Sequence, residues 1–469
     1  NVLIQNLFNS GGLNMTEKKR NQISIKSKNK LPNLPISTIW MISFGFFGVQ
    51  MAFQLQSSNM GRIFQTLGAN PNDLGFFFIL PPLAGLIVQP LIGYFSDKTW
   101  IPKIGRRIPY LVVGSVVAVI VMCLLPNAGS FGFGFGSMAA LLFGSITILF
   151  MDLSSNVAMQ PFKMMVGDMV NEKQKGFAYS IQSFLSNSGA VLASIFPFIL
   201  TIIGVSNTAP EGVIPQSVII SFYIGAIILI ICSLFTVFKV KEYPPKEYAL
   251  YHGINENEPK EKINVFKLLL NAPKVFWTVA IVQFFCWMGF QYLWTYGTGA
   301  IALNVWHTTE AYSQAYQSAG NWFGILSAVQ SISAVLWSLI LSRTSNSKRK
   351  FFYTLSLILG GVGFGSIFFI HNEFALIISF ILIGMAWAGM MTFPFTILTN
   401  ALSGKNIGMY LGLFNGSICL PQIVASCLSF ALFPLVGSSM PSMLLISGIL
   451  LIIGALSVSI IKENKTNNK

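Results

Sequence analysis

The sequence predicts an all-α membrane protein in which twelve transmembrane helices form two six-helix pseudo-repeats. The prediction depends on scarce charge, abundant apolar residues and an uneven distribution of lysine and arginine. Of the 469 residues, 53% are hydrophobic and 9% are charged, and the mean hydropathy is +0.66. A soluble domain carries about 25% charged residues, so a soluble enzyme, a secreted disulfide scaffold and a disordered protein are disfavoured. Continuous apolar runs also argue against an outer-membrane barrel, whose strands alternate polar and apolar residues.

Twelve apolar segments are long enough to cross a bilayer, which takes about 20 residues per helix. Prolines such as Pro81, Pro90 and Pro394 fall inside these segments. Membrane helices tolerate such breakers because neighbouring helices satisfy the freed backbone groups. The spans are expected at 37–60, 73–95, 108–126, 136–160, 175–203, 216–238, 274–303, 314–341, 351–370, 374–398, 407–434 and 441–461.

Lysine and arginine are concentrated in every second connection between these spans. All but one of the 29 lie in the two tails or in the connections after even-numbered spans, and the exception is Arg62. This bias predicts that both termini are cytoplasmic. The net charge of +14 is therefore interpreted as an orientation signal. Attraction to anionic lipid headgroups is a second effect, and no nucleic-acid partner is expected.

The chain is expected to consist of two halves joined by a linker that contains Pro244 and Pro245. Weak self-similarity relates the halves, as is usual in secondary transporters. The matching pairs are Gln50 with Gln283, Pro161 with Pro394 and Gly176 with Gly408. The predicted units are a basic cytoplasmic tail (1–36), an N-terminal six-helix half (37–238), a cytoplasmic linker (239–273), a C-terminal six-helix half (274–461) and a cytoplasmic tail (462–469).

Few residues are suited to catalysis or to holding a cofactor. The five cysteines lie in apolar runs, where they act as small buried hydrophobes. The three histidines are isolated, so no metal centre or nucleophile–histidine–acid set is predicted. The sequence has no phosphate-binding loop of the G-x4-GK[ST] type, which argues against ATP coupling. We expect neither an enzyme nor a cofactor.

A motif after the second span resembles the signature loop of the major facilitator superfamily. It reads Gly93-Tyr94-Phe95-Ser96-Asp97-Lys98 and, after a long spacer, Gly105-Arg106-Arg107-Ile108-Pro109-Tyr110. This version is similar to the sucrose and glycoside branch, which comprises the plant sucrose carriers and solute-carrier family 45. The resemblance implies the major facilitator fold. It also implies a cytoplasmic gate made of Gly93, Asp97, Arg106 and Arg107, which braces the start of span 11 near Gly408.

Asp152 is the acidic residue that this span assignment places well inside the membrane. A charge there costs about 2.5–3.5 kcal/mol on insertion scales, which indicates a functional site. An apolar environment disfavours an ionised carboxyl group, so the residue is suited to take up and release a proton. Asn156 and Gln160 follow at i+4 and i+8 on the same helix face. The alternative is a structural contact between helices. Resemblance to the sucrose carriers implies that an aspartate at this position takes part in proton coupling.

Amides and tryptophans inside the spans complete the predicted pathway. Amides donate and accept hydrogen bonds without needing a counter-ion, so they suit an uncharged sugar, although some must bridge helices instead. Tryptophan rings can stack on a pyranose, or simply pack. Arg62 is either a donor to the sugar or to Asp152, or a snorkelling interfacial arginine. The predicted binding residues are Gln50, Gln54, Arg62, Asn156, Gln160, Gln283, Trp287, Gln291, Trp387, Asn415 and Gln422.

These observations predict a proton-coupled symporter that imports a neutral sugar by alternating access. A disaccharide such as maltose or sucrose is the expected substrate. A sodium-coupled glycoside symporter would share the topology, and a non-transporting membrane scaffold or sensor is the alternative from another class. A multidrug exporter fits less well because amide-rich pathways suit hydroxylated solutes. We expect a monomer in contact with membrane lipid, in a bacterial inner membrane.

Overall fold

The computed structural model describes residues 31–252, 265–401, 410 and 413–462. The described residues form helices, with a single isolated β-bridge between Ile101 and Gly105 in place of any sheet. The helices of the first half are α3 (Ile36–Thr66), α4 (Leu74–Phe77), α5 (Leu80–Lys98), α6 (Ile108–Leu124), α7 (Met138–Met169), α8 (Glu172–Ile202) and α9 (Gln216–Lys239). Two short helices follow, α10 (Pro245–His252) and α11 (Val265–Leu270). The second half comprises α12 (Lys274–Trp306), α13 (Gln314–Leu341), α14 (Arg349–Phe369), α15 (Leu376–Ala401), α17 (Gly416–Leu435) and α18 (Met440–Ser457).

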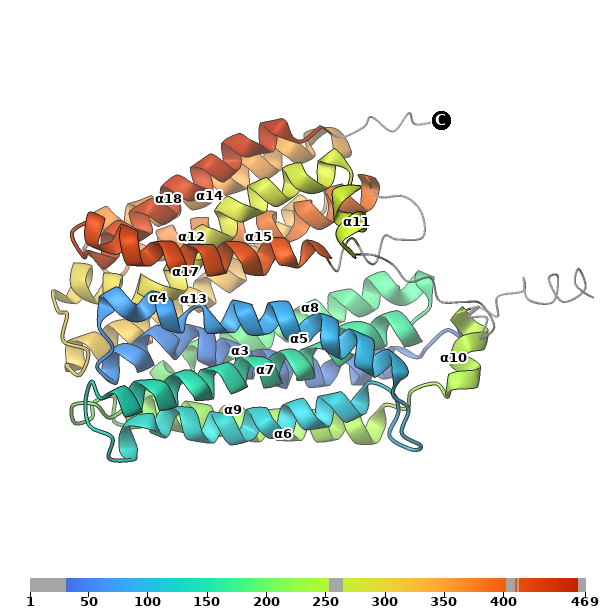
Figure 1. The fold of residues 1–469 in the computed structure, drawn as a ribbon, viewed down its shortest axis with the longest axis horizontal. Helices are drawn as coiled ribbons and strands as arrows, with labels where there is room; N and C mark the ends of the chain where they lie inside the picture. The colour runs from blue at the N-terminus through green and yellow to red at the C-terminus, as the bar shows by residue number, and fades with distance from the viewer. Residues whose placement is uncertain (1–30, 253–264, 402–409, 411–412, 463–469) are drawn as a thin grey trace, which may run out of the picture.

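The helices form two bundles that lie side by side (Figure 1). The first bundle contains α3–α9 and the second contains α12–α18. Corresponding pairs of helices pack in both bundles. The first helix packs on the sixth (α3 on α9, α12 on α18), and the third packs on the fourth (α6 on α7, α14 on α15). This repetition is the structural form of the two predicted pseudo-repeats.

Twelve helical segments of the described chain are long and apolar enough to cross a membrane. Large apolar side chains point outward from them at helical spacing, as Val113, Val116 and Ile120 do on α6 with exposed fractions of 53–60%. An apolar surface of this kind fits contact with lipid rather than with water. The predicted fold class, an all-α membrane protein with twelve spans, is confirmed.

Local signals set where several helices begin. The side chains of Ser137, Asn171 and Ser313 cap α7, α8 and α13, each accepting a hydrogen bond from a backbone N–H three residues later. Helix α12 ends at His307, which has a left-handed backbone with φ of 51°. These positions agree with the predicted spans to within a few residues.

Two helices are longer than predicted. Helix α3 continues six residues past the predicted end at residue 60, so Arg62 lies within the helix. Helix α7 continues past Gln160 to Met169, with Pro161 inside it. Prolines in membrane helices need not end them, and the extension brings Lys163 onto the helix rather than into a loop. Span 11 was predicted at 407–434; residues 407–409, 411 and 412 of it lie outside the described residues, and α17 begins at Gly416.

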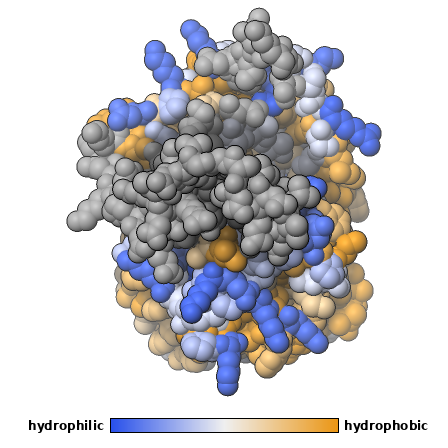
Figure 2. Space-filling model, turned by 90° about the vertical axis from the view of Figure 1, so that its right-hand side faces the viewer, coloured by the Kyte–Doolittle hydropathy of each residue, from blue (hydrophilic) through white to orange (hydrophobic). Residues whose placement is uncertain are grey.

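The molecule has two unlike ends. The basic end carries the connection between α5 and α6, the connection between α7 and α8, and α10. Figure 2 shows hydrophilic residues gathered at this end, with apolar residues along the sides. At the opposite end, polar side chains join the two bundles. Side-chain hydrogen bonds between the bundles there involve Thr66, Phe78 and Thr201 of the first bundle. These hydrogen bonds close the end of the molecule that lies opposite the basic end, which we call the opposite end.

Candidate functional site

A stripe of polar residues runs along α7, the fourth span. Asp152 is 1% exposed, and its Oδ2 accepts a hydrogen bond of 2.5 Å from Gln56 Nε2 on α3. Asn156 donates from Nδ2 to the Asp152 backbone oxygen at 2.9 Å, and its Oδ1 accepts from Gln89 Nε2 at 2.8 Å. Gln160 is half-buried and makes no side-chain hydrogen bond. The three predicted residues thus share one helix face, with the carboxyl group buried.

The stripe faces the second bundle. A Cβ added at Gly85 of α5 would lie 3.6 Å from Cys419 Sγ of α17 and 3.9 Å from Asn156 Nδ2. Three helices therefore meet at Gly85, two from the first bundle and one from the second. The absence of a side chain there allows this approach. The polar face of α7 accordingly borders the interface between the bundles.

Lys163 extends the same stripe and was missed by the sequence analysis. It lies eleven residues after Asp152, so it repeats the spacing of Asn156 and Gln160, and its side chain is exposed. Its ammonium group lies near Cys419 of the second bundle. The spacing signal was present in the sequence, but the fourth span was predicted to end at residue 160, which put Lys163 in the following connection.

An aromatic cluster in the second bundle contains both predicted stacking residues. Trp287 and Trp387 have ring centroids 5.6 Å apart and planes at 76°. Trp294 lies 6.4 Å from Trp287 and 6.1 Å from Trp387. The backbone oxygen of Trp294 is 3.3 Å from where a Cβ of Gly61 on α3 would lie. The cluster therefore reaches the bundle interface, while Trp287 itself is only 6% exposed.

Several predicted binding residues are already hydrogen-bonded within the protein. Gln283 accepts from Trp287 Nε1 at 2.6 Å and donates to Tyr353 Oη at 3.0 Å. Gln291 donates to the backbone oxygen of Phe78 in the other bundle at 2.8 Å. Gln54 donates to Ser58 Oγ and Ser194 Oγ, at 2.9 and 3.1 Å. In this conformation, these amides connect helices.

Other predicted residues have amides free for a ligand. Gln50, Gln160 and Gln422 are half-buried and make no side-chain hydrogen bond to another described residue, and among those residues Asn415 has only a weak contact of 4.0 Å to Cys419 Sγ. Free, half-buried amides supply both donors and acceptors to a polar ligand. Their roles in substrate binding stay predictions.

Arg62 joins the two bundles at the opposite end. Its Nε donates to Gln317 Oε1 at 2.6 Å, its Nη1 to Asn321 Oδ1 at 2.8 Å and its Nη2 to Asn207 Oδ1 at 2.8 Å. The side chain is 1% exposed, and the described residues offer it no carboxylate. Arg62 is therefore bound to amides, two of them across the interface and one in its own bundle, rather than to Asp152. We call Arg62 and these three partners the amide latch.

The predicted gate residues lie together at the basic end. Arg107 forms ion pairs with Asp97 Oδ1 through Nη2 at 2.6 Å and with Asp168 Oδ2 through Nε at 2.9 Å. Arg106 lies over the Tyr248 ring of α10, with its Cζ 3.8 Å from the ring centroid. Gly93 allows α5 to approach α7, because a Cβ there would lie 3.1 Å from Met164 Cε. The predicted partner near Gly408 lies outside the described residues.

Linker residues complete this network and were not predicted. Tyr248 Oη donates to Asp168 Oδ1 at 3.1 Å. Glu242 Oε1 accepts from the backbone N–H groups of Arg107 and Ile108, at 2.8 and 2.9 Å, at the start of α6. Burial raises the pKa of the Glu242 carboxyl above its usual range, and these backbone donors partly oppose the shift. The linker therefore packs against the first bundle.

We expect the two carboxylates on Arg107 to contribute unequally to stability. The Asp97 side chain is 60% exposed and that of Asp168 is 18% exposed. Exposed ion pairs contribute about 0–1 kcal/mol, whereas a shielded charge-assisted hydrogen bond contributes about 1.5–3 kcal/mol. Asp168→Asn should lower the thermal unfolding temperature of the detergent-purified protein clearly more than Asp97→Asn. Equal shifts for the two variants would contradict this ranking.

The family model described as Major Facilitator Superfamily matches residues 42–426. The chain belongs to the Major Facilitator Superfamily. This superfamily member is 24% identical to sucrose transport protein SUT1 of Oryza sativa subsp. japonica, over 83% of this chain and 81% of the relative. It is 23% identical to sucrose transport protein SUC4 of Arabidopsis thaliana, over 81% of each chain.

A solved structure shows the same fold. A mutant of the nucleoside transporter NupG superposes with a TM-score of 0.67 at 16% identity, covering 90% of this chain and 99% of that one. The predicted resemblance to the superfamily and to its sucrose carrier branch is confirmed. This superfamily member is an integral membrane protein.

Proposed function

We propose that this chain is a proton-coupled symporter that imports a neutral disaccharide such as maltose or sucrose. The observation that carries the proposal is Asp152, a buried carboxyl group beside the bundle interface, with no basic partner within hydrogen-bond distance among the described residues. An intramembrane carboxyl in that setting is suited to carry a proton. The two relatives named as sucrose transport proteins support a sugar as the substrate.

Transport in this proposal proceeds by alternating access of a site between the two bundles. The lysine and arginine bias puts the basic end in the cytoplasm, so closure of the opposite end corresponds to an inward-facing state. Asp152 takes a proton from outside, the loaded protein reorients, and the proton leaves inside. One proton crossing 100 mV supplies about 2.3 kcal/mol, or about 50-fold accumulation of a neutral solute.

Free amides favour a neutral, hydroxylated substrate over an ionic one. Gln50, Gln160 and Gln422 have unused donors and acceptors, which hydroxyl groups can match. An ionic substrate would require a counter-charge. Lys163 is the one cation we identify on the α7 stripe, and it is available to a substrate hydroxyl.

Gln56 is suited to serve both protonation states of Asp152. In the structure its Nε2 donates to the carboxyl, while its buried Oε1 has no hydrogen-bond partner. Rotation of the amide by a half turn would present Oε1 to a protonated carboxyl as an acceptor. Gln56 is thus a positioning residue that keeps the proton site hydrogen-bonded throughout the cycle.

Replacing Gln56 by Leu should move the external pH for half-maximal uptake upward. The substitution removes the donor that stabilises the charged carboxyl, so the proton is held more tightly. A purely structural role would lower the maximal rate without moving the pH profile. Initial uptake rates of labelled sugar between pH 5 and pH 9 separate these outcomes, and an unmoved profile contradicts the assigned role.

The experiment that tests the function is uptake by proteoliposomes under an imposed pH gradient. A panel of radiolabelled maltose, sucrose, glucose and xylose identifies the substrate. We expect accumulation of a disaccharide that collapses when a protonophore dissipates the gradient. Accumulation that requires sodium and causes no alkalinisation supports a sodium symporter instead. Absence of transport under every gradient supports a scaffold or sensor.

A further inference from the structure

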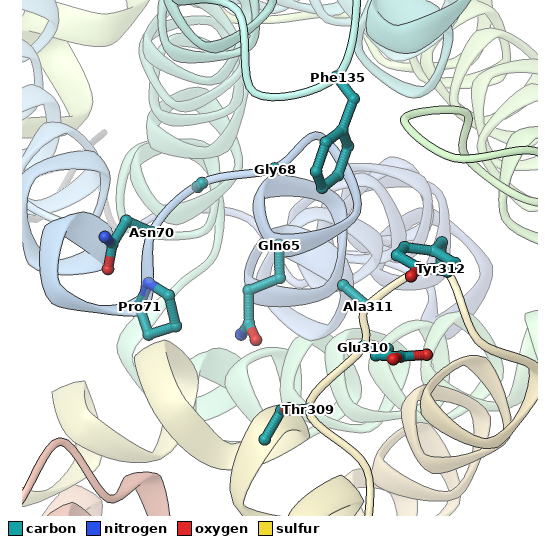
Figure 3. A pocket seen from close by; sticks show the side chains of 10 residues that line it. Gln65, Gly68, Asn70, Pro71, Phe135, Thr309, Glu310, Ala311 and Tyr312 are labelled. Carbon is teal, nitrogen blue, oxygen red and sulfur yellow. The ribbon is translucent and has the colours of Figure 1, made fainter.

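A pocket between the two bundles lies at the opposite end, at the outer end of the proposed transport pathway and apart from Asp152. Its volume is about 370 Å³, which is at the small end of the range for ligand pockets. Both bundles contribute to its wall. Gln65, Asn70 and Phe135 come from the first bundle, and Thr309, Glu310 and Tyr312 come from the connection between α12 and α13 of the second. We call it the vestibule pocket (Figure 3).

Gln65 supplies an unused donor to this pocket. Its side chain is 5% exposed, and its Nε2 has no hydrogen-bond partner. Figure 3 shows the amide extending into the middle of the ring of lining residues. Leaving a buried donor unsatisfied costs about 1–3 kcal/mol. A ligand that offers an acceptor at this point would recover that energy.

Two aromatic rings on one side of the pocket provide an apolar surface. Phe135 and Tyr312 have ring centroids 6.4 Å apart and planes at 88°, and they are 46% and 40% exposed. Phe135 is presented by a loop in which Gly134 and Gly136 have φ of 82° and 66°. Such angles favour glycine, so the placement of the ring is built into this sequence.

The combination of rings, amides and hydroxyls indicates the chemical class of the ligand. A pyranose ring has an apolar face for aromatic stacking and hydroxyl groups around its edge. Glu310, Thr309 and Asn70 are exposed at the rim and are suited to those hydroxyls. The inward-pointing Gln65 N–H would repel a cation. A neutral glycoside therefore fits the pocket better than a metal ion does.

The pocket is connected to the amide latch. Gln317, which accepts from Arg62, also donates to the backbone oxygen of Ala311 in the pocket wall and to Thr66 Oγ1 of α3. The two walls belong to different bundles, so they meet in this way only while the opposite end is closed. A ligand that prefers one conformation shifts the population toward it.

We propose that the vestibule pocket is a regulatory site for a neutral pyranoside, distinct from the transport site. A glycoside bound there joins the two bundles and holds the opposite end closed. High sugar on that side then slows reopening and limits the transport rate. The pyranoside-binding chemistry depends on the pocket alone, whereas the effect on transport rests on the proposed function.

The test combines equilibrium binding with uptake, using the full-length protein. Radiolabelled maltose and sucrose are titrated against the wild type and a Phe135→Ala/Tyr312→Ala variant in nanodiscs. Phe131→Ala serves as the matched control, because Phe131 is an exposed ring in the same loop. We expect two classes of site in the wild type and in the control. The double variant should weaken one class by about tenfold or more.

Uptake measurements should show the same difference between the wild type and the double variant. In the wild type, the initial rate should fall at high external sugar, and in the double variant it should saturate without falling. A single binding class that is unaffected by the double substitution overturns the proposal. Saturable sodium binding at the pocket that Glu310→Gln abolishes, with sugar binding unchanged, also overturns it. If no variant transports sugar but the aromatic-dependent class remains, the transport function fails while the pocket proposal stands.

Discussion

Replacing Asp152 by Asn should abolish gradient-driven accumulation of sugar while the protein still folds. Asparagine keeps an oxygen that can accept the Gln56 hydrogen bond, but it cannot carry a proton. At 100 mV the accumulation ratio should fall from about 50 to about 1. Exchange of labelled for unlabelled sugar, which needs no net proton movement, should persist. The measurement is uptake by proteoliposomes with and without a pH gradient.

The matched control for this variant is Asp73→Asn. Asp73 is an exposed aspartate at the opposite end, so the same chemical change is made outside the proposed pathway. It should leave both accumulation and exchange unchanged. Accumulation by the Asp152 variant at the wild-type level would remove the proton assignment. Loss of exchange as well as accumulation would indicate a role in binding rather than in coupling.

Replacing Gln317 by Leu should open the opposite end. The substitution removes the acceptor for Arg62 Nε and the donor to Thr66 and Ala311, and it leaves a buried positive charge with fewer partners. Losing one charge-assisted hydrogen bond costs about 1.5–3 kcal/mol, which is more than tenfold in the conformational equilibrium. Spin labels at the exposed Glu211 and His371, one on each bundle, would report the change as longer distances.

Gln422→Leu is the control for the latch experiment. Gln422 is a half-buried glutamine of the second bundle with no side-chain hydrogen bond, so the same loss of an amide should not move the distance distribution. Labels would be placed in a chain without Cys123 and Cys427, whose side chains are exposed. If the Gln317 variant kept the wild-type distances, the amide latch would not determine closure.

The sequence predicted those features that depend on local pattern. Apolar runs located the spans, the charge bias predicts an orientation, and the spacing of Asp152 and Asn156 put both on one helix face. The signature motif correctly grouped Asp97 with Arg107. These inferences use neighbours in the chain or a family resemblance, and neither requires knowledge of tertiary contacts.

Features that depend on packing were not predictable in this way. Arg62 contacts Gln317, which lies 255 residues away in the chain. Its neutral partners could not be predicted because they depend on how the two bundles pack. Tyr248 lies in a linker whose composition gave no sign of an aromatic contact with Arg106. Lys163 was missed for a different reason, because the predicted fourth span ended at residue 160 whereas α7 continues to Met169.

The choice of amide oxygens around Arg62 has a consequence for the environment in which the protein works. Amides do not titrate, and groups sheltered from water are little affected by added salt. The hydrogen bonds of the amide latch should therefore keep the same strength at low or high salt and at neutral or acidic pH. The ion pair between Arg107 and the exposed Asp97 lacks this protection, so added salt should weaken the contacts at the basic end and leave those of Arg62 unchanged.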